Sequence, residues 1–506
     1  MSKEEVSRRN FIKFIVTGVV CGVVAGVGGY FSGIAAAPPP KTVTVPTTII
    51  SSTTVTETKT VTAVPTSPKP TTPASPTPKW RPRGSYTRVK WPDLHGKTIT
   101  YLAIDPHKVY ADLTAKKFEA LTGCKVKVMY IPFGKEYAKW ALDVKTGARE
   151  IDVVQETYAW VPKLIEEGLA EDITDFVHEH WDEIEPEDFV PVCWEYYTGL
   201  KWNGRIYGLP YDGDVHVLSY RPSIIEKFGL KLDTWVDHFE AVKTITENMA
   251  PEMYGTSIMG IPIWEAGIGN HFVNRMLAYG GDYFKDMDPH KGPAIDSPEC
   301  VAALQNLIDE IPYMIPGTLS FSFDEHKDAY FHGKTAMMEN WPDIACYRAK
   351  NPAESELPPE DVRIKPLPKG PPPKGKLAPA LNVGWANFVS SASKHKEAAK
   401  YFVMFASSYE AVMGGLIGMG GMDCVRMSEW EDPMLLSWDP NYVEVDKWSM
   451  LNGKIAYPWI PECSELQDKL IVHIYKAIEG KVDAETALRN VAEEWDTILR
   501  KAGYYK

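Results

Sequence analysis

Residues 97–167 alternate between two hydrophobic periods, and this alternation limits the possible folds more than any other feature of the chain. The expected elements, in order, are a strand at 97–103, a helix at 110–121, a strand at 125–130, a helix at 135–146, a strand at 151–154 and a helix at 161–167. Gly123 and Gly147 follow the first two helices, where glycine is a common C-cap. The order predicts an α/β fold with a parallel sheet and helices on both faces.

In open α/β sheets the ligand site forms in the loops that follow the carboxyl ends of the strands. Here the expected loops are residues 105–107 and 155–158. The end of the chain is expected to be helical at 466–479 and 484–501, and the proline-rich residues 357–379 are expected to form a surface loop. The folded part is expected to begin near Trp91, and a chain of 506 residues favours two domains plus accessory segments.

The amino-terminal part has the pattern of an export signal followed by a stalk. Arg8 and Arg9 precede Phe11 and an uncharged Val/Gly/Ala-rich run at 14–37, which resembles a twin-arginine signal and is long enough to span a bilayer. Cleavage near Ala37 and a retained anchor both remain open. Thr, Ser and Pro fill 25 of the 38 positions from 41 to 78, which predicts an extended stalk without a core, within a stalk region assigned to 38–90.

Charge and cysteine content exclude several classes of protein. The net charge is −13, and it divides into +9 for residues 1–90 and −22 for the remainder, so the acidic body disfavours nucleic acid as a partner. The seven cysteines show no zinc-site spacing, and the six in the body are expected either to pair or to be buried thiols. No Walker loop, GxGxxG or GxSxG motif occurs, so no cofactor and no metal are predicted.

Three loop segments combine aromatic and acidic residues. Asp212 and Asp214 are two residues apart, so in an extended segment both would face the same side, as an acid pair or as acceptors for sugar hydroxyls. A solvated turn is the ordinary alternative, because Asp-Gly is a turn signal. Trp264 with Glu265, and Trp341, would suit a sugar site, since aromatic faces stack on sugars and carboxylates accept from hydroxyls; the alternative is that each tryptophan fills the core.

From about residue 97 to 500 the chain resembles the substrate-binding proteins of carbohydrate ABC importers, the maltose/trehalose-type extracellular solute-binding proteins. The resemblance depends on the order of several short segments along the chain, and no single one of them carries it. The segments are 112–119 (DLTAKKFE), 151–155 (IDVVQ), 168–173 (GLAEDI), 207–211 (YGLPY), 333–338 (GKTAMM), 340–342 (NWP) and 393–399 (SKHKEAA). Residues 420–426 (GGMDCVR) depart from the family, in which Pro and Arg often follow the glycine pair, so the identity of the ligand does not transfer.

The resemblance implies two α/β lobes joined by a hinge, with the ligand in the cleft between them. The first lobe would comprise 91–214 and 385–427, and the second 215–384 and 428–506. Alignment with the family's cleft segments implies these ligand-binding residues: Asp105, Glu156, Trp160, Tyr211, Asp212, Asp214, Trp264, Glu265, Trp341 and Trp385.

The function implied is capture of a sugar or oligosaccharide outside the membrane and its delivery to the permease subunits of an ABC transporter, by a monomer that is not an enzyme. Two other hypotheses stay open. One is a surface glycoside hydrolase that uses Asp212 and Asp214, and the other is a ligand-sensing or adhesion module on the same fold. Peptides, polyols and other polar solutes also remain possible ligands.

Overall fold

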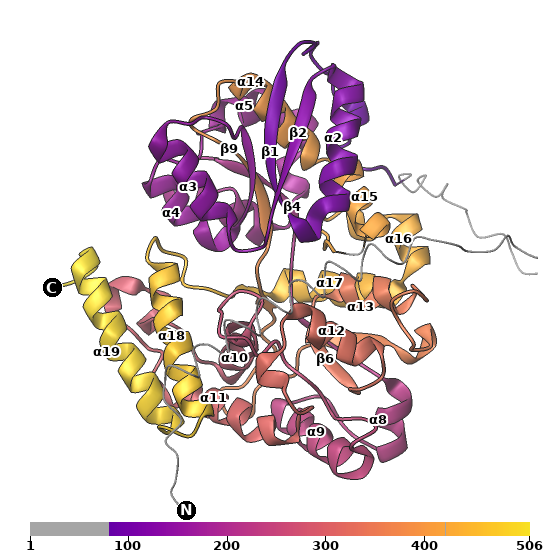
Figure 1. The fold of residues 1–506 in the computed structure, drawn as a ribbon, viewed down its shortest axis with the longest axis vertical. Helices are drawn as coiled ribbons and strands as arrows, with labels where there is room; N and C mark the ends of the chain where they lie inside the picture. Colours follow the sequence, from indigo (N-terminus) through magenta and orange to yellow (C-terminus); the bar gives the residue numbers. More distant parts are fainter. Residues whose placement is uncertain (1–79, 420) are drawn as a thin grey trace, which may run out of the picture. The chain divides into compact units, whose positions relative to one another are not determined.

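Two larger β-sheets and one two-stranded sheet organise the part of the chain that the computed structural model describes, which is residues 80–419 and 421–506 (Figure 1). Residues 77–506 form a unit by themselves. The expected twin-arginine signal, the uncharged run at 14–37, the 41–78 stalk and Cys21 lie outside the described residues. Among the described helices, none combines the length and the apolar character that a membrane crossing requires.

The first lobe is built on a five-stranded sheet. Its strands, in spatial order, are β2 (Lys125–Ile131), β1 (Thr98–Ile104), β3 (Val153–Thr157), β9 (Trp385–Val389) and β4 (Gly208–Asp212). β1 pairs in parallel with both β2 and β3, which confirms the predicted β-α-β-α-β order. The sheet is not parallel throughout, because β9, which lies outside the segment used for the prediction, runs antiparallel to both β3 and β4. β9 follows β3 by more than 200 residues, a distance at which local periodicity gives no information about direction.

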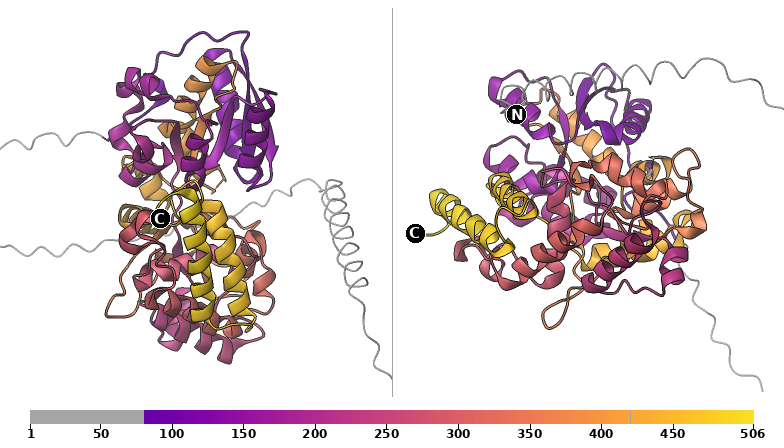
Figure 2. Two further views of the ribbon diagram at one scale, coloured as in Figure 1. Left: turned by 90° about the vertical axis from the view of Figure 1, so that its left-hand side faces the viewer. Right: turned by 60° about the horizontal axis from the view of Figure 1, so that its bottom comes forward.

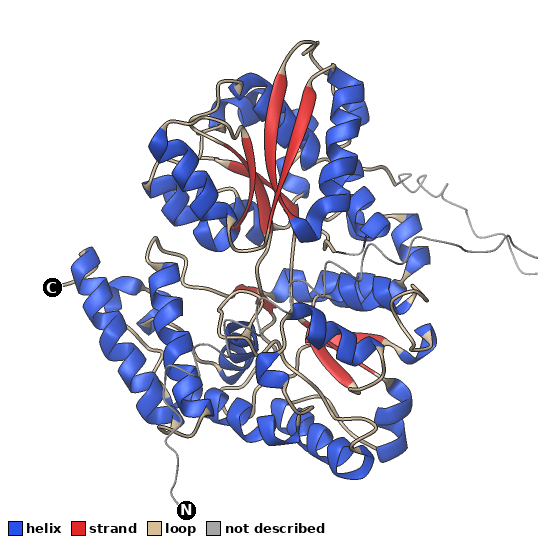
Figure 3. Ribbon diagram, in the orientation of Figure 1, coloured by secondary structure: helices blue, strands red, loops and turns tan. Residues whose placement is uncertain are grey.

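Helices cover both faces of this sheet (Figure 3). They are α2 (Lys108–Thr122), α3 (Glu136–Thr146), α4 (Val161–Glu166), α5 (Thr174–Glu179), α6 (Trp181–Ile184), α7 (Leu200–Asn203), α14 (Lys396–Ala406) and α15 (Tyr409–Met419). The predicted glycine caps are confirmed, since Gly123 and Gly147 adopt left-handed conformations at the ends of α2 and α3, with φ of +75° and +71°. α2 starts directly after the turn that follows β1, so this turn lies at the carboxyl end of the sheet.

The second lobe contains a three-stranded antiparallel sheet in the order β6 (Met337–Asn340), β5 (Val217–Tyr220) and β7 (Arg363–Pro366). β7 corrects the expectation that 357–379 is simply a surface loop. Ile364 and Leu367 from this segment are each 2% exposed and belong to the core. Proline is compatible with β7 because the strand lies at the sheet edge, where a missing N–H removes no ladder bond on the open side.

The helices of the second lobe surround this sheet and enlarge the lobe on one side of it. They are α8 (Pro222–Phe228), α9 (Trp235–Met249), α10 (Ile268–Tyr279), α11 (Pro298–Glu310), α12 (Phe323–Phe331), α13 (Pro342–Ala349), α16 (Pro433–Trp438), α17 (Pro440–Asn452), α18 (Cys463–Ile478) and α19 (Ala484–Ala502). α18 and α19 confirm the two helices predicted at the end of the chain, and they pack side by side (Figure 2).

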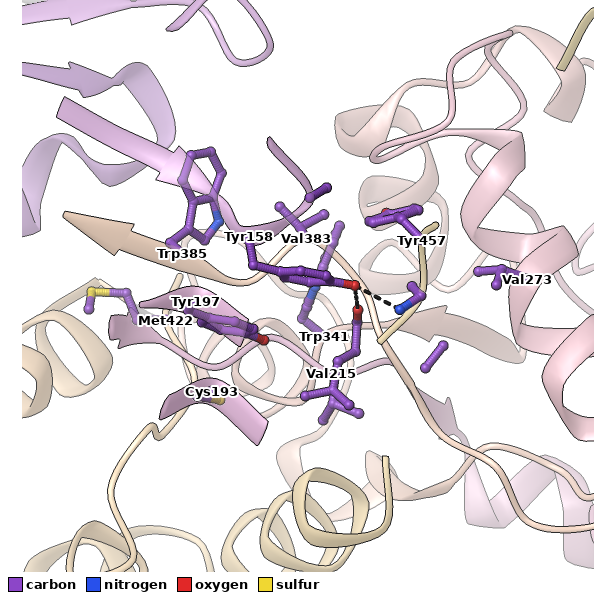
Figure 4. Packing of buried hydrophobic residues seen from close by; sticks show 14 of the residues in the cluster. Tyr158, Cys193, Tyr197, Val215, Val273, Trp341, Val383, Trp385, Met422 and Tyr457 are labelled. Carbon is purple, nitrogen blue, oxygen red and sulfur yellow. Dashed lines mark hydrogen bonds between the residues drawn. The ribbon is translucent and has the colours of Figure 1, made fainter. Parts of the chain in front are cut away.

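The chain passes between the two sheets at several places that are far apart in sequence. It leaves the first sheet between β4 and β5 and returns between β8 (Ala380–Leu381) and β9. β8 pairs in parallel with β10 (Lys454–Ile455). Tyr158 lies next to this pair, because its hydroxyl donates to Leu381 O at 2.6 Å and accepts from Ala456 N at 2.7 Å (Figure 4). The segments that connect the lobes are therefore bonded to the first lobe at the end of β3.

The folded part begins earlier than the expected position near Trp91. Trp80 Nε1 donates to Ser428 O at 3.1 Å, and Glu185 pairs with Arg81 at 2.8 Å and with Arg88 at 2.7 Å. Burial opposes ionisation of Glu185, but the hydrogen bond from Arg81 and the neighbouring donors lower its pKa to about 2. Residues 80–90 were expected to belong to the stalk; their partners lie about 100 or more residues away, so the local composition does not reveal them.

The six cysteines of the body are all buried free thiols in the described structure. Of the two expectations, disulfide pairing is therefore wrong for these residues and burial as thiols is confirmed. Each one behaves as a small apolar side chain within its lobe.

Candidate ligand-binding cleft

A cavity of about 640 Å³ is lined by residues from both lobes and from the segments that connect them. The first lobe and the return loop contribute Ile104, Asp105, Pro106, His107, Phe133, Trp385 and Gly421. The second lobe and the connections contribute Asp214, Ile261, Ile263, Ala266, Ser322, Phe323, Asp324, Trp341, Asp343, Ile344, Arg348 and Val383. Its walls therefore combine aliphatic and aromatic surfaces with a few acidic groups, as ligand pockets commonly do.

The turn after β1 supplies one wall of the cavity, as expected from the position of strand ends in α/β sheets. Asp105, Pro106 and His107 form a short 3₁₀ turn between β1 and α2, and all three line the cavity. His107 is buried; its Nδ1 lies 2.8 Å from the Tyr211 hydroxyl, and burial lowers its pKa to about 3. His107 is therefore neutral at physiological pH.

Two of the predicted tryptophans line the cavity. Trp341 precedes α13, and its Nε1 donates to Asn382 O at 3.1 Å, which fixes the indole between the second lobe and the return connection. Trp385 opens β9, where its ring lies 5.1 Å from that of His107 and 5.8 Å from that of Phe133. Both residues are held by neighbours from more than one segment, and the close-up in Figure 4 shows them near the connecting strands.

Only one of the two carboxyl residues, Asp214, lines the cavity, and the segment is not extended at Asp214, which corrects the extended-segment hypothesis. Asp214 adopts a positive φ of +52°, so the chain turns after β4. Asp214 lines the cavity, and its Oδ2 accepts from Gly384 N at 3.1 Å. Asp212 is fully buried at the end of β4, where its Oδ1 accepts from Asp423 N at 2.7 Å. This arrangement does not suit a hydrolase, which needs both carboxylates at one glycosidic bond.

Tyr211 and Asp212 contact the cavity wall from behind. Tyr211 is fully buried and stacks on Tyr110 with ring centroids 4.8 Å apart, while its hydroxyl meets His107. Asp212 Oδ2 lies 3.5 Å from His107 Nε2. These two predicted site residues therefore hold His107 in place and do not themselves line the cavity.

The other four predicted residues form a direct contact between the lobes, which we call the Glu265 contact: Glu156, Trp160, Trp264 and Glu265, together with Thr157. Glu265 Oε1 accepts from Thr157 Oγ1 at 2.7 Å, and Oε2 lies 3.4 Å from Trp160 Nε1. The rings of Trp160 and Trp264 are 5.9 Å apart. None of these residues lines the cavity, although Ala266, next to Glu265, does.

Burial dominates the electrostatics of the Glu265 contact. Burial raises the pKa of Glu265 to about 8 and that of Glu136, at the start of α3, to about 7. Burial also raises the pKa of Glu156 well above its usual range, and the negative charge of Glu136 adds to the shift. The protonated forms are therefore favoured here, and a neutral Glu265 still accepts the bond from Thr157.

Sequence reasoning missed several residues of the cavity wall, notably Asp343, Arg348, Phe133 and Phe323. Asp343 follows Trp341 by two residues, and this proximity was a usable signal. Arg348 lies one and a half turns further along α13, and it also pairs with Glu354. The two phenylalanines lie in sequence contexts typical of core residues, so nothing in the sequence alone marks them as cavity residues.

Comparison with known proteins identifies the family. Residues 105–413 match the model of a family described as bacterial extracellular solute-binding protein. The chain belongs to this family. It is therefore an exported solute-binding protein, and the family and its structural neighbours are binding proteins.

One curated relative of this solute-binding protein is a probable amino-acid ABC transporter periplasmic-binding protein of Sinorhizobium fredii. It is 25% identical over 404 residues, which cover 78% of this chain and 86% of the relative. Two solved structures share the fold. An ABC transporter solute-binding protein of Agrobacterium radiobacter K84 in complex with ribitol has a TM-score of 0.72 at 22% identity, covering 80% of this chain and all of the other. Maltose-bound MalE3 of T. maritima has a TM-score of 0.69 at 24% identity, covering 79% and 99%. These similarities establish the two-lobe periplasmic-binding-protein-like fold.

Proposed function

We propose that this solute-binding protein captures a sugar or oligosaccharide outside the membrane and delivers it to the permease of an ABC transporter. The observation that carries the proposal is the cavity between the lobes, where Trp341 and Trp385 meet Asp105 and Asp214. Aromatic faces pack on the C–H faces of sugars, and carboxylates accept from hydroxyls. The ribitol and maltose complexes of the structural neighbours support a polyhydroxylated ligand.

The proposed mechanism is closure around the ligand. The lobes would comprise 91–214 with 385–427, and 215–384 with 428–506, with the connections near Asp214 and Val383 acting as the hinge. A ligand that contacts both walls binds the closed state better than the open one, so it shifts the equilibrium towards closure. The closed form then presents both lobes to the permease. We also propose that the protein is a monomer tethered by its amino-terminal segment at the outer face of the membrane.

A thermal-shift screen of the full chain tests this function. The panel contains neutral mono- and oligosaccharides, polyols and amino acids. A sugar at one hundred times its Kd is expected to stabilise the native state by about 2.7 kcal/mol, and the melting temperature rises accordingly. The rise should be reduced in a Trp341→Ala variant. A rise with amino acids alone, and none with any sugar or polyol, would refute the proposal.

A further inference from the structure

The cavity walls contain more acidic than basic residues. Four of the lining residues are aspartates, namely Asp105, Asp214, Asp324 and Asp343. Among the described residues of the lining, Arg348 alone has a permanent positive charge; it pairs with Glu354, and its charge also acts on Asp343. His107 also lines the cavity, but burial keeps it neutral. A neutral sugar would therefore enter a site whose acidic groups have almost no cationic partners.

Two of these aspartates are buried, and one has an oxygen that lacks a partner. Asp343 is 1% exposed, and its Oδ2 accepts no hydrogen bond from residues 80–419 or 421–506, although the residue lines the cavity. Asp214 is 7% exposed and uses Oδ2 to accept from Gly384 N. A buried carboxylate without a partner is costly, so Asp343 can take one further hydrogen bond or ion pair at this wall of the cavity.

Further aspartates lie behind this wall and increase the imbalance. We call the whole group the aspartate cluster: Asp212, Asp214, Asp343, Asp423 and Asp446. Asp423 Oδ1 is 3.3 Å from Asp343 N, and Asp446 Oδ2 accepts from Trp430 Nε1 at 2.7 Å. Asp212, Asp423 and Asp446 each also have one buried oxygen without a hydrogen-bond partner. Within residues 80–419 and 421–506, no group of acidic, histidine and cysteine side chains has the arrangement of a metal site.

We propose that the solute is a polyhydroxylated compound that carries a protonated amine, with the ammonium group held by Asp214 and Asp343. The inference builds on the proposed function and narrows its ligand class from sugars in general to amino sugars and related amino-polyols. The aromatic residues Trp341 and Trp385 accept the carbon skeleton, while the ammonium group supplies the positive charge that the protein does not.

Proton release is a signature of this binding mode. In the free protein, burial raises the pKa of Asp343 to about 7, and burial together with the charge of Asp343 raises that of Asp214 well above its usual range. An ammonium group nearby favours the ionised carboxylates, so their pKa values fall on binding and protons leave the site. A neutral sugar does not have this effect.

Within the part of the chain that the structure describes, the titratable groups around Asp214 and Asp343 include a single cation. They are Asp212 from β4, Cys193 and Tyr197 from the helical turn at 193–197, Asp423 and Cys424 from the return loop, Tyr442 and Asp446 from α17, and Arg348 from α13. All except Arg348 are neutral or negative, and Arg348 has Glu354 as its partner.

Matched ligand pairs test the inference with the full chain. Each pair contains an amino-deoxy sugar with a primary amine and its N-acetyl derivative, which has the same skeleton without the charge. Calorimetry at pH 6 in two buffers of different ionisation enthalpy gives affinity and proton release together. We expect the amine form of at least one pair to bind at least tenfold more tightly than its acetylated partner, with protons released.

The variants assign the preference to the site. Asp343→Asn and Asp214→Asn should each reduce the preference for the amine at least threefold. Asp328→Asn removes the same charge from an exposed position on α12 outside the cavity, and it should leave the preference unchanged. If either site variant fails to fold, the matched pairs on the native chain still decide the question.

The two proposals fail in different ways. Equal or tighter binding of the neutral sugars would overturn the amine inference and leave the proposed function intact. Binding of amines that lack hydroxyl groups, such as putrescine, with no binding of any sugar, would overturn both. A preference for the amine that persists unchanged in Asp343→Asn and Asp214→Asn would overturn the assignment to these two residues.

Discussion

Trp341 and Trp385 line the cavity, whereas Trp160 and Trp264 lie outside its lining and face each other 5.9 Å apart across the two lobes. All four were implied by the family resemblance, which placed their segments at the cleft, and for Trp264 and Trp341 the neighbouring acidic residues gave a second reason. In the first pair the rings border empty volume. In the second pair the neighbouring acid, Glu265, already accepts from Thr157 and lies within reach of Trp160.

This difference separates two roles for similar residues at one interface between lobes. Where protein groups satisfy each other, the side chains stabilise the contact between the lobes. Among the described residues, Asp343, which has one unpartnered oxygen, belongs to the cavity lining, whereas Glu156, which also has one, belongs to the Glu265 contact outside that lining. Position at the cavity lining, rather than the residue type or the state of the polar partners, distinguishes the ligand site from the Glu265 contact.

The largest expected effect is on stability, from Trp264→Ala. Trp264 is 8% exposed and packs between Trp160 and Tyr457, with ring centroids 5.9 and 5.1 Å away. Truncation leaves a void among rings, so the free energy of unfolding should fall by about 3–5 kcal/mol. Denaturant titration measures this change. A loss of ligand affinity with no loss of stability would instead place Trp264 in the ligand site.

Trp341→Ala should weaken binding and, because Trp341 is 8% exposed like Trp264, should also lower the free energy of unfolding. Because one side of Trp341 borders the cavity, the variant loses a surface for the ligand and should bind it more weakly by about 1–3 kcal/mol. Calorimetry with the ligand found in the screen measures the change. Trp341→Phe, which keeps an aromatic face, is the matched control and should retain most of the affinity. Equal affinities for all three proteins would contradict the assignment.

The sequence predicted the first lobe best where neighbours in space are also neighbours in sequence. β1, α2, β2, α3 and β3 follow one another, so hydrophobic period and glycine caps suffice to place them. β7 was missed because its pairing with β5 joins segments more than 140 residues apart and its composition is rich in proline.

The candidate site was predicted as a region but not residue by residue. Asp105 and Asp214 line the cavity, whereas Asp212, two residues from Asp214, is buried behind it because the chain turns at a positive φ. Glu265 faces Thr157 from the other lobe, and this contact depends on how the two lobes meet. Such pairings arise from tertiary structure, and a local pattern does not contain them.

Glu265→Gln should remove a pH dependence of the Glu265 contact. Burial raises the pKa of Glu265 to about 8, above its unfolded value near 4.5, so the neutral form is favoured in the folded state. Stability from this group is complete below pH 4.5 and is lost as the pH rises towards 8, with a slope of at most about 1.4 kcal/mol per pH unit.

Glutamine does not ionise and still offers an oxygen to Thr157, so the variant should lack this part of the slope. The measurement is the difference in unfolding free energy between the native chain and Glu265→Gln from pH 5 to 8, because other buried acids contribute equally to both. A difference that does not vary with pH would contradict the raised pKa.

The smallest expected effect is from Thr157→Val, which tests whether the Glu265 contact belongs to the closed state. Valine keeps the shape of threonine but removes the hydroxyl that donates to Glu265 Oε1 at 2.7 Å. The loss of one such hydrogen bond costs about 0.5–1.5 kcal/mol. If the bond forms only on closure, that cost falls on the closed state alone, and ligand affinity should drop about two- to twelvefold.

Thr157→Ser keeps the donor and should restore most of the affinity. Calorimetry gives the affinities, and small-angle scattering with and without ligand reports the population of the closed form. If affinity stays the same in Thr157→Val while stability falls, the bond exists in both open and closed states, and the Glu265 contact holds the lobes together without opposing their opening.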